Sequence, residues 1–205
     1  MKGSQFYSLQ KIVSLTILQA LIMLLIYSCD QDNYIPKPRG YLRIDLPEHE
    51  YQLFDTTFPY QFEYPIYAHI AFDKYTQREP FWLNIDYPGL NGKIHLSYKH
   101  LKNANLNDMV EDSRTMVYKH APKAIGIRES IVNDPTSNVF GTVYSIEGKD
   151  VASPFQFYVT DSVHHFLRGA LYFNTVPNND SLQPVIEFII DDIDQLIGTL
   201  EWKEL

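Results

Sequence analysis

The stretch that decides the fold is residues 180–200, DSLQPVIEFIIDDIDQLIGTL. Its apolar side chains recur every three or four residues, which is the spacing of one face of a helix. The residues on this face are Leu182, Val185, Ile186, Ile189, Ile193, Leu196, Ile197 and Leu200. Asp180 or Ser181 is a suitable cap for the first turn. We therefore expect a long amphipathic helix that buries one face against the rest of the protein.

Upstream of this helix, apolar and polar residues alternate as they do in strands. Residues 81–87 and 94–98 alternate on either side of the turn-forming stretch PGLNG, which predicts a β-hairpin. Further strands are expected at residues 125–132, 139–147, 154–160 and 164–173. The short turns between them, such as Asp134-Pro135, predict an antiparallel meander.

The remaining segments of the body complete the predicted fold class. Asn105 can cap a second helix that ends before Pro122. Residues 41–46 alternate and predict a short first strand, whereas for residues 51–80 we expect irregular structure with one strand near residues 62–72. Strands followed by a terminal helix indicate an α+β protein, in which helices cover one antiparallel sheet.

The N-terminus has the layout of an export signal. Lys2 and Lys11 precede an apolar run at residues 12–27, and the sequence LIYSC at residues 25–29 resembles the bacterial lipobox. A retained transmembrane anchor is the alternative, but the run is near the lower limit for spanning a bilayer. We expect cleavage before Cys29.

Cys29 is the only cysteine of the chain. An exported protein normally pairs its cysteines in disulfides, and this one has no partner, so we interpret it as a lipid acceptor. Diacylglycerol on the thiol and an N-linked acyl chain such as palmitate would anchor the protein stably, because several acyl chains bind a bilayer where one binds only marginally. No other cofactor is expected.

The charge of the chain argues against some classes of function. The 17 basic residues include Lys2 and Lys11, whereas all 25 acidic residues come after residue 28, so the part after the leader carries 15 bases against 25 acids and a net charge of −10. Such a body is repelled by nucleic acids and by anionic bilayer surfaces. We predict a signal peptide at residues 1–28, a lipidated, proline-containing tether at residues 29–40 and a single domain at residues 41–205.

Two parts of the sequence resemble a known family. The block PKPRGYLRIDLP at residues 36–47, directly after the lipobox, is similar to the gliding-motility lipoprotein GldD of Bacteroidota. The stretch FQFYVTDSVHHFLRGALYF at residues 155–173 and the stretch from PVIEFII at residues 184–190 to Trp202 are similar as well.

The resemblance implies a non-enzymatic protein of the cell envelope that is needed for gliding and tied to the type IX secretion machinery. Its expected partners are other envelope proteins of that machinery, and no nucleic acid. The order of strands and helix also looks like the PsbP-type α/β/α sandwich. The sequence leaves open whether the lipid sits in the inner or the outer membrane, and whether the body is periplasmic or at the surface.

The block at residues 36–47 is the candidate site for binding a partner. Lys37, Arg39, Tyr41 and Arg43 lie in it, and its basic side chains form a local positive cluster in an acidic protein. Alternation places Arg43 on the side opposite Leu42, where it is available to a partner's carboxylate or carbonyl. The alternative is that the arginines pair with acids of this same chain.

Other polar groups have mainly structural interpretations. His164 and His165 are adjacent in an expected strand and point to opposite faces, so a shared metal ion is disfavoured. Glu187, Asp191 and Asp194 form a solvated acidic stripe on the last helix, with docking of a basic partner as the alternative. We expect Asp192, at the edge of the apolar face, to meet a sheet donor or water.

Three short motifs resemble the Asp-Ser/Thr acceptor pattern for O-glycosylation in Bacteroidota. They are centred on Thr56, Ser162 and Ser181. A hairpin turn explains Ser162 and a helix cap explains Ser181, because Asp and Ser favour both. Thr56 remains the candidate for modification.

Two other classes of function stay open from the sequence. One is an envelope lipoprotein that binds a lipid or a glycan, which an apolar cavity beneath the sheet would favour. The other is a hydrolase, which a convergent buried cluster of histidines and acids would favour. A filled core favours the gliding component.

Overall fold

The computed structural model describes residues 14–19, 44–72, 79–101 and 105–204. The chain divides into two compact units, Met1–Gly40 and Tyr41–Leu205. In the first unit, residues 14–19 are helical. None of the helices in the described ranges is long and apolar enough to span a membrane. The expected cleavage site and the tether at residues 29–40 lie outside the described residues and stay predictions.

The second unit is built on a seven-stranded sheet in which every neighbouring pair is antiparallel. The strand order is β3-β4-β5-β9-β8-β7-β6. The strands are β3 (His69–Phe72), β4 (Leu83–Tyr87), β5 (Gly92–His100), β6 (Gly126–Asp134), β7 (Val139–Glu147), β8 (Phe155–Thr160) and β9 (His165–Phe173). The predicted hairpin is β4–β5, and the predicted meander runs from β6 to β9, so both are confirmed.

A second, three-stranded sheet has the order β1-β2-β10. Its strands are β1 (Tyr51–Phe54), β2 (Tyr60–Pro65) and β10 (Glu201–Trp202). The expectation of irregular structure with one strand at residues 62–72 was therefore wrong. A tight turn, in which the Ala68 amide donates to the Pro65 carbonyl at 3.1 Å, splits that run between β2 of the small sheet and β3 of the large one.

The expected strand at residues 41–46 was also wrong in its described part. Residues 44–50 form no strand, and residues 41–43 lie outside the described ranges. Alternation shows which side chains are apolar, but a strand also needs a neighbour for its backbone. The backbone of this segment is tied at its end, where the Ile66 amide donates to the Glu50 carbonyl at 3.0 Å. Leu46 still packs against the core.

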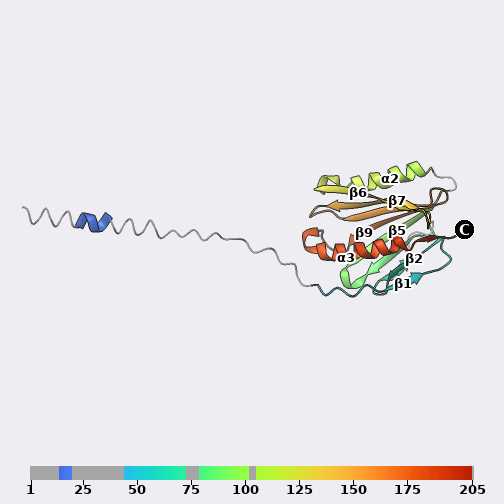
Figure 1. Ribbon diagram of the computed structural model, residues 1–205, viewed down its shortest axis with the longest axis horizontal. Helices are drawn as coiled ribbons and strands as arrows, with labels where there is room; N and C mark the ends of the chain where they lie inside the picture. The colour runs from blue at the N-terminus through green and yellow to red at the C-terminus, as the bar shows by residue number, and fades with distance from the viewer. Residues whose placement is uncertain (1–13, 20–43, 73–78, 102–104, 205) are drawn as a thin grey trace, which may run out of the picture. The chain divides into compact units, whose positions relative to one another are not determined.

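The predicted terminal helix is α3 (Asn179–Gly198), and its apolar face is confirmed. Ile189 and Ile193 are fully buried against the large sheet, and Leu200 is buried just beyond the helix end. The helix begins before the expected caps, because its N-cap is Asn178. In Figure 1, α3 runs next to the small sheet, where it packs against β2.

The other helix, α2 (Leu106–Tyr118), lies on the opposite face of the large sheet. Asn105 caps it as predicted, accepting a hydrogen bond from the Asn107 amide at 3.1 Å. Val117 packs against Tyr144 of β7. Tyr144 is paired with Gln156, so it points away from the face that carries Phe157 and the α3 core. The protein is thus an α/β/α sandwich of the α+β class, as expected from the sequence.

Candidate functional site

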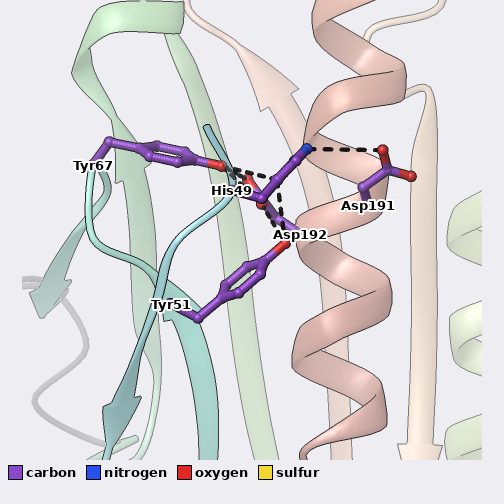
Figure 2. A network of polar contacts seen from close by, with 5 residues as sticks. All are labelled: His49, Tyr51, Tyr67, Asp191 and Asp192. Atoms are coloured by element: carbon purple, nitrogen blue, oxygen red, sulfur yellow. Dashed lines mark hydrogen bonds and ion pairs between the residues drawn. The ribbon is translucent and has the colours of Figure 1, made fainter. Parts of the chain in front are cut away.

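The most deeply buried charged side chain among the described residues is Asp192 of α3, with 1% of the residue exposed. Three side chains from elsewhere in the chain converge on its carboxylate (Figure 2). The Tyr67 hydroxyl donates to Oδ1 at 2.8 Å and to Oδ2 at 2.9 Å, and the Tyr51 hydroxyl donates to Oδ1 at 3.2 Å. His49 Nδ1 lies 2.9 Å from Oδ1.

Each of these partners comes from a different segment. His49 belongs to residues 44–50, Tyr51 begins β1, and Tyr67 lies in the turn between β2 and β3. The His49 ring also stacks on Phe188 of α3, with 4.2 Å between ring centroids, and its Nε2 is 3.9 Å from the exposed carboxylate of Asp191. The cluster therefore joins the entry segment of the body, the small sheet and α3.

Burial sets the electrostatics of the cluster. It raises the pKa of Asp192, although the hydrogen bonds from Tyr67, His49 and Tyr51 oppose this shift. Burial and the nearby carboxylate also raise the pKa of Tyr51 to about 12 and that of Tyr67 further above its usual value. Both phenols stay protonated at neutral pH, so they act as hydrogen-bond donors.

This chemistry suits a clamp better than catalysis. The Asp192 side chain is 0% exposed, so a substrate cannot reach its carboxylate. The tyrosines have raised pKa values, which is the opposite of an activated nucleophile. We expected Asp192 to meet a sheet donor or water, and instead its donors are side chains, only one of which, Tyr51, lies in a strand. The sequence carries no signal for this, since His49 and Asp192 are 143 residues apart.

The histidine pair His164 and His165, at the β8–β9 turn, is held by contacts within the fold. Asp161 accepts hydrogen bonds from the backbone amides of Val163, His164 and His165 at 3.0, 2.8 and 2.7 Å. His165 is buried and stacks on Trp202, with ring centroids 5.0 Å apart, whereas the His164 side chain is 62% exposed. Within the part of the chain that the structure describes, no group of three or more His, Cys, Asp or Glu residues is arranged to hold a metal ion.

The acidic stripe of α3 is solvated, because Glu187, Asp191 and Asp194 are all exposed. Thr56 is exposed too, in the turn between β1 and β2, where its hydroxyl accepts from the Phe58 amide at 3.3 Å. Its glycosylation stays a prediction, as does docking of a partner on the stripe.

The other predicted site residues fall outside the described ranges. They are the lipidation site Cys29 and the partner-binding residues Lys37, Arg39, Tyr41 and Arg43. Their roles remain predictions. Directly after Arg43, the structure describes residues 44–50, the segment that His49 fixes on α3.

Comparison with known proteins identifies the class. The model of the gliding motility lipoprotein GldD family matches residues 31–202, so the chain belongs to this family. It is accordingly a lipoprotein of the cell envelope associated with gliding motility. None of the curated proteins compared with the chain matches it.

Three solved chains are similar to this chain, and one of them is a PsbP protein. It is the solution structure of the cyanobacterial PsbP protein CyanoP from Synechocystis sp. PCC 6803, with a TM-score of 0.44 and 10% sequence identity. The similarity covers 78% of this chain and 97% of that one. The α/β/α arrangement of this chain rests on the sheet and helices described above.

Proposed function

We propose that the chain is a non-enzymatic, lipid-anchored envelope lipoprotein that serves as a component or assembly factor of the gliding and type IX secretion machinery. The observation that carries this proposal is the family match at residues 31–202, which spans almost all of the chain beyond Cys29. A match of that extent concerns the body and the predicted tether together. Its partners are other envelope proteins of the same machinery.

The geometry of the body supports a binding role. The core between the large sheet and α3 is filled by large side chains such as Phe62, Tyr87 and Phe157, each 1% exposed or less. The buried cluster at Asp192 is sealed and holds the segment directly after residues 36–43 against α3. A partner that binds residues 36–43 would then be connected directly to the folded body, because the next segment is fixed on α3.

The test is replacement of the native copy by a variant with Arg39→Gln and Arg43→Gln. A docking role predicts that this variant accumulates and is lipidated like the wild type but does not glide, because exposed ion pairs contribute only about 0–1 kcal/mol to stability. The matched control is Arg128→Gln, which removes an exposed arginine of β6 that is paired with Glu147. The control strain should glide normally.

Three further measurements define the role. If the protein is an assembly factor, its deletion lowers the amounts of other apparatus proteins and stops secretion of type IX cargo. If it is needed only for motility, its deletion stops gliding and leaves secretion intact. Protease treatment of intact and lysed cells shows which face carries the body. A deletion strain that glides and secretes normally would overturn the proposed function.

A further inference from the structure

The face of the large sheet that carries α2 is only partly covered by this helix. Val117 of α2 packs over Tyr144 and Ile146 of β7. Beside this contact, a groove of about 540 Å³ runs between α2 and the strands β4, β5 and β9. This volume lies within the range of about 300–1,000 Å³ that is usual for ligand sites.

Arg168 of β9 lies in the groove as a half-buried cation. Its Nη2 donates to Gln156 Oε1 at 2.5 Å. Among residues 44–72, 79–101 and 105–204, no carboxylate oxygen lies within 4.0 Å of its guanidinium. Burial lowers the pKa of Arg168, yet a guanidinium remains charged at any physiological pH.

A half-buried arginine without a carboxylate partner is a suitable binding site for an anion. Side chains of this kind are seldom buried unless they are paired. The body has ten more acids than bases after residue 28, yet none of the described carboxylates pairs with Arg168 within 4.0 Å, Asp112 of the same groove included. The planar fork of a guanidinium matches a carboxylate with two parallel hydrogen bonds.

Apolar side chains surround the cation. Phe166 and Ala170, two residues before and after Arg168 on the same face of β9, form the floor of the groove, while Met109 and Met116 form the wall on α2. Met116 is 41% exposed, so its side chain is accessible to a molecule bound in the groove. Methionines adapt to partners of different shape, so this wall suits a bound apolar side chain.

The polar groups of the groove favour a peptide over an acyl chain. Asn84 and Ser97 on the strands and Asp112 on α2 line it together with the apolar residues. Asn84 already contacts His95, and the Ser97 hydroxyl donates to the Arg168 carbonyl. However, an acyl chain would give no partner to their remaining polar atoms or to the Arg168 guanidinium, which is costly. A peptide backbone has donors and acceptors along its whole length and can satisfy them.

We propose that this groove binds an acidic peptide segment of a partner protein. A side-chain or C-terminal carboxylate of the segment pairs with Arg168, and a neighbouring apolar side chain packs between Phe166 and the methionines of α2. The proposal rests on the proposed function in one respect: the partner is expected to be a protein of the gliding apparatus. Binding itself is measured in vitro, so its failure and the failure of the gliding role are separate results.

The experiment titrates the full-length protein, purified in detergent, with the peptide Ac-Leu-Glu-Leu-NH₂ by isothermal titration calorimetry. The controls are Ac-Leu-Gln-Leu-NH₂ and hexanoate, which test the charge and the acyl-chain alternative. The chain has two tryptophans, and Trp82 lines the groove, so Trp82 emission in a Trp202→Phe background locates the binding. We expect saturable binding of the acidic peptide, about 10- to 100-fold weaker for its glutamine counterpart, since a charged hydrogen bond is lost.

Substitutions of the arginine complete the test. Arg168→Gln should abolish the preference for the acidic peptide, Arg168→Lys should retain part of it, and the exposed Arg128→Gln should leave it unchanged. Melting temperatures confirm that each variant is folded. Hexanoate binding more tightly than the acidic peptide would overturn the peptide assignment in favour of a lipid. Equal affinity for the two peptides, or no binding at millimolar concentration, would overturn the proposal as well.

Discussion

Gly92 lies where α3 is seated on the large sheet, and a methyl group there has a definite effect. A Cβ atom on Gly92 would lie 2.8 Å from Cδ1 of Ile189, which is too close for two carbon atoms. Its next neighbours, Phe173 and Tyr87, would be 3.5 and 3.7 Å away, at ordinary contact distances. The clash in Gly92→Ala is therefore confined mainly to one terminal methyl group of the helix.

This geometry sets the expected change in the free energy of unfolding. Overpacking of a core costs about 1–3 kcal/mol, and the lower entropy of alanine in the unfolded chain returns about 0.4–1 kcal/mol. Ile189→Val removes the clashing methyl group and by itself costs about 0.5–1.5 kcal/mol. In the double variant the alanine methyl occupies the vacated space, so we expect it to be more stable than the sum of the single effects predicts, by about 1–2 kcal/mol.

The assay is urea unfolding of the full-length protein in detergent, monitored by far-ultraviolet circular dichroism. Gly89→Ala is the matched control, because no atom lies within 4 Å of a Cβ at that position. Single effects that add within about 0.5 kcal/mol would show that Ile189 does not lie over Gly92. The register of α3 on the sheet would then be wrong.

Other substitutions test the remaining parts of the argument. Ile189→Asp should unfold the body, because an unpaired carboxylate at a fully buried position costs several kcal/mol out of a total stability of about 5–15 kcal/mol. Glu187→Ala, on the exposed side of α3, should melt close to the wild type. Equal melting temperatures of the two variants would contradict the assigned helix face. The raised pKa of Asp192 means that the folded state favours its protonated form. Its contribution to the free energy of unfolding is therefore largest below the unfolded pKa of about 3.9, and it is lost as the pH rises through the folded pKa. Asp192→Asn cannot ionise, so its urea midpoint should fall less than that of the wild type between pH 4 and pH 7, and parallel pH profiles would refute this. Cys29→Ala should abolish labelling with an alkynyl fatty acid, and equal labelling of the two proteins would exclude Cys29 as the lipid acceptor.

The elements that the sequence predicted well are those whose pattern is local. The face of α3 is set by a helical spacing that continues for about twenty residues, and β4–β5 is set by alternation on both sides of a turn. The meander from β6 to β9 arises in the same way, because short turns leave consecutive strands little choice but to pair. The lipobox around Cys29 is a local motif too, but it lies outside the described residues and stays a prediction.

Tertiary structure decided the features that depend on a distant partner. Whether a run becomes a strand depends on a neighbouring strand to pair with: residues 44–46 form no strand, whereas β2 pairs with both β1 and β10. Asp192 was recognised at the edge of the helix face, but its partners Tyr67 and His49 lie 125 and 143 residues away, and no spacing rule connects them.

The groove at Arg168 shows the same division. The sequence placed Arg168 in a strand and the methionines in a helix, but only the position of α2 over β7 leaves the neighbouring strands uncovered. Local patterns fix backbone hydrogen bonds and the apolar face of each element, since these depend on residues a few positions apart. Which charges are paired and which surface stays open depends on how the elements pack, because packing sets the distances between residues that are remote in sequence.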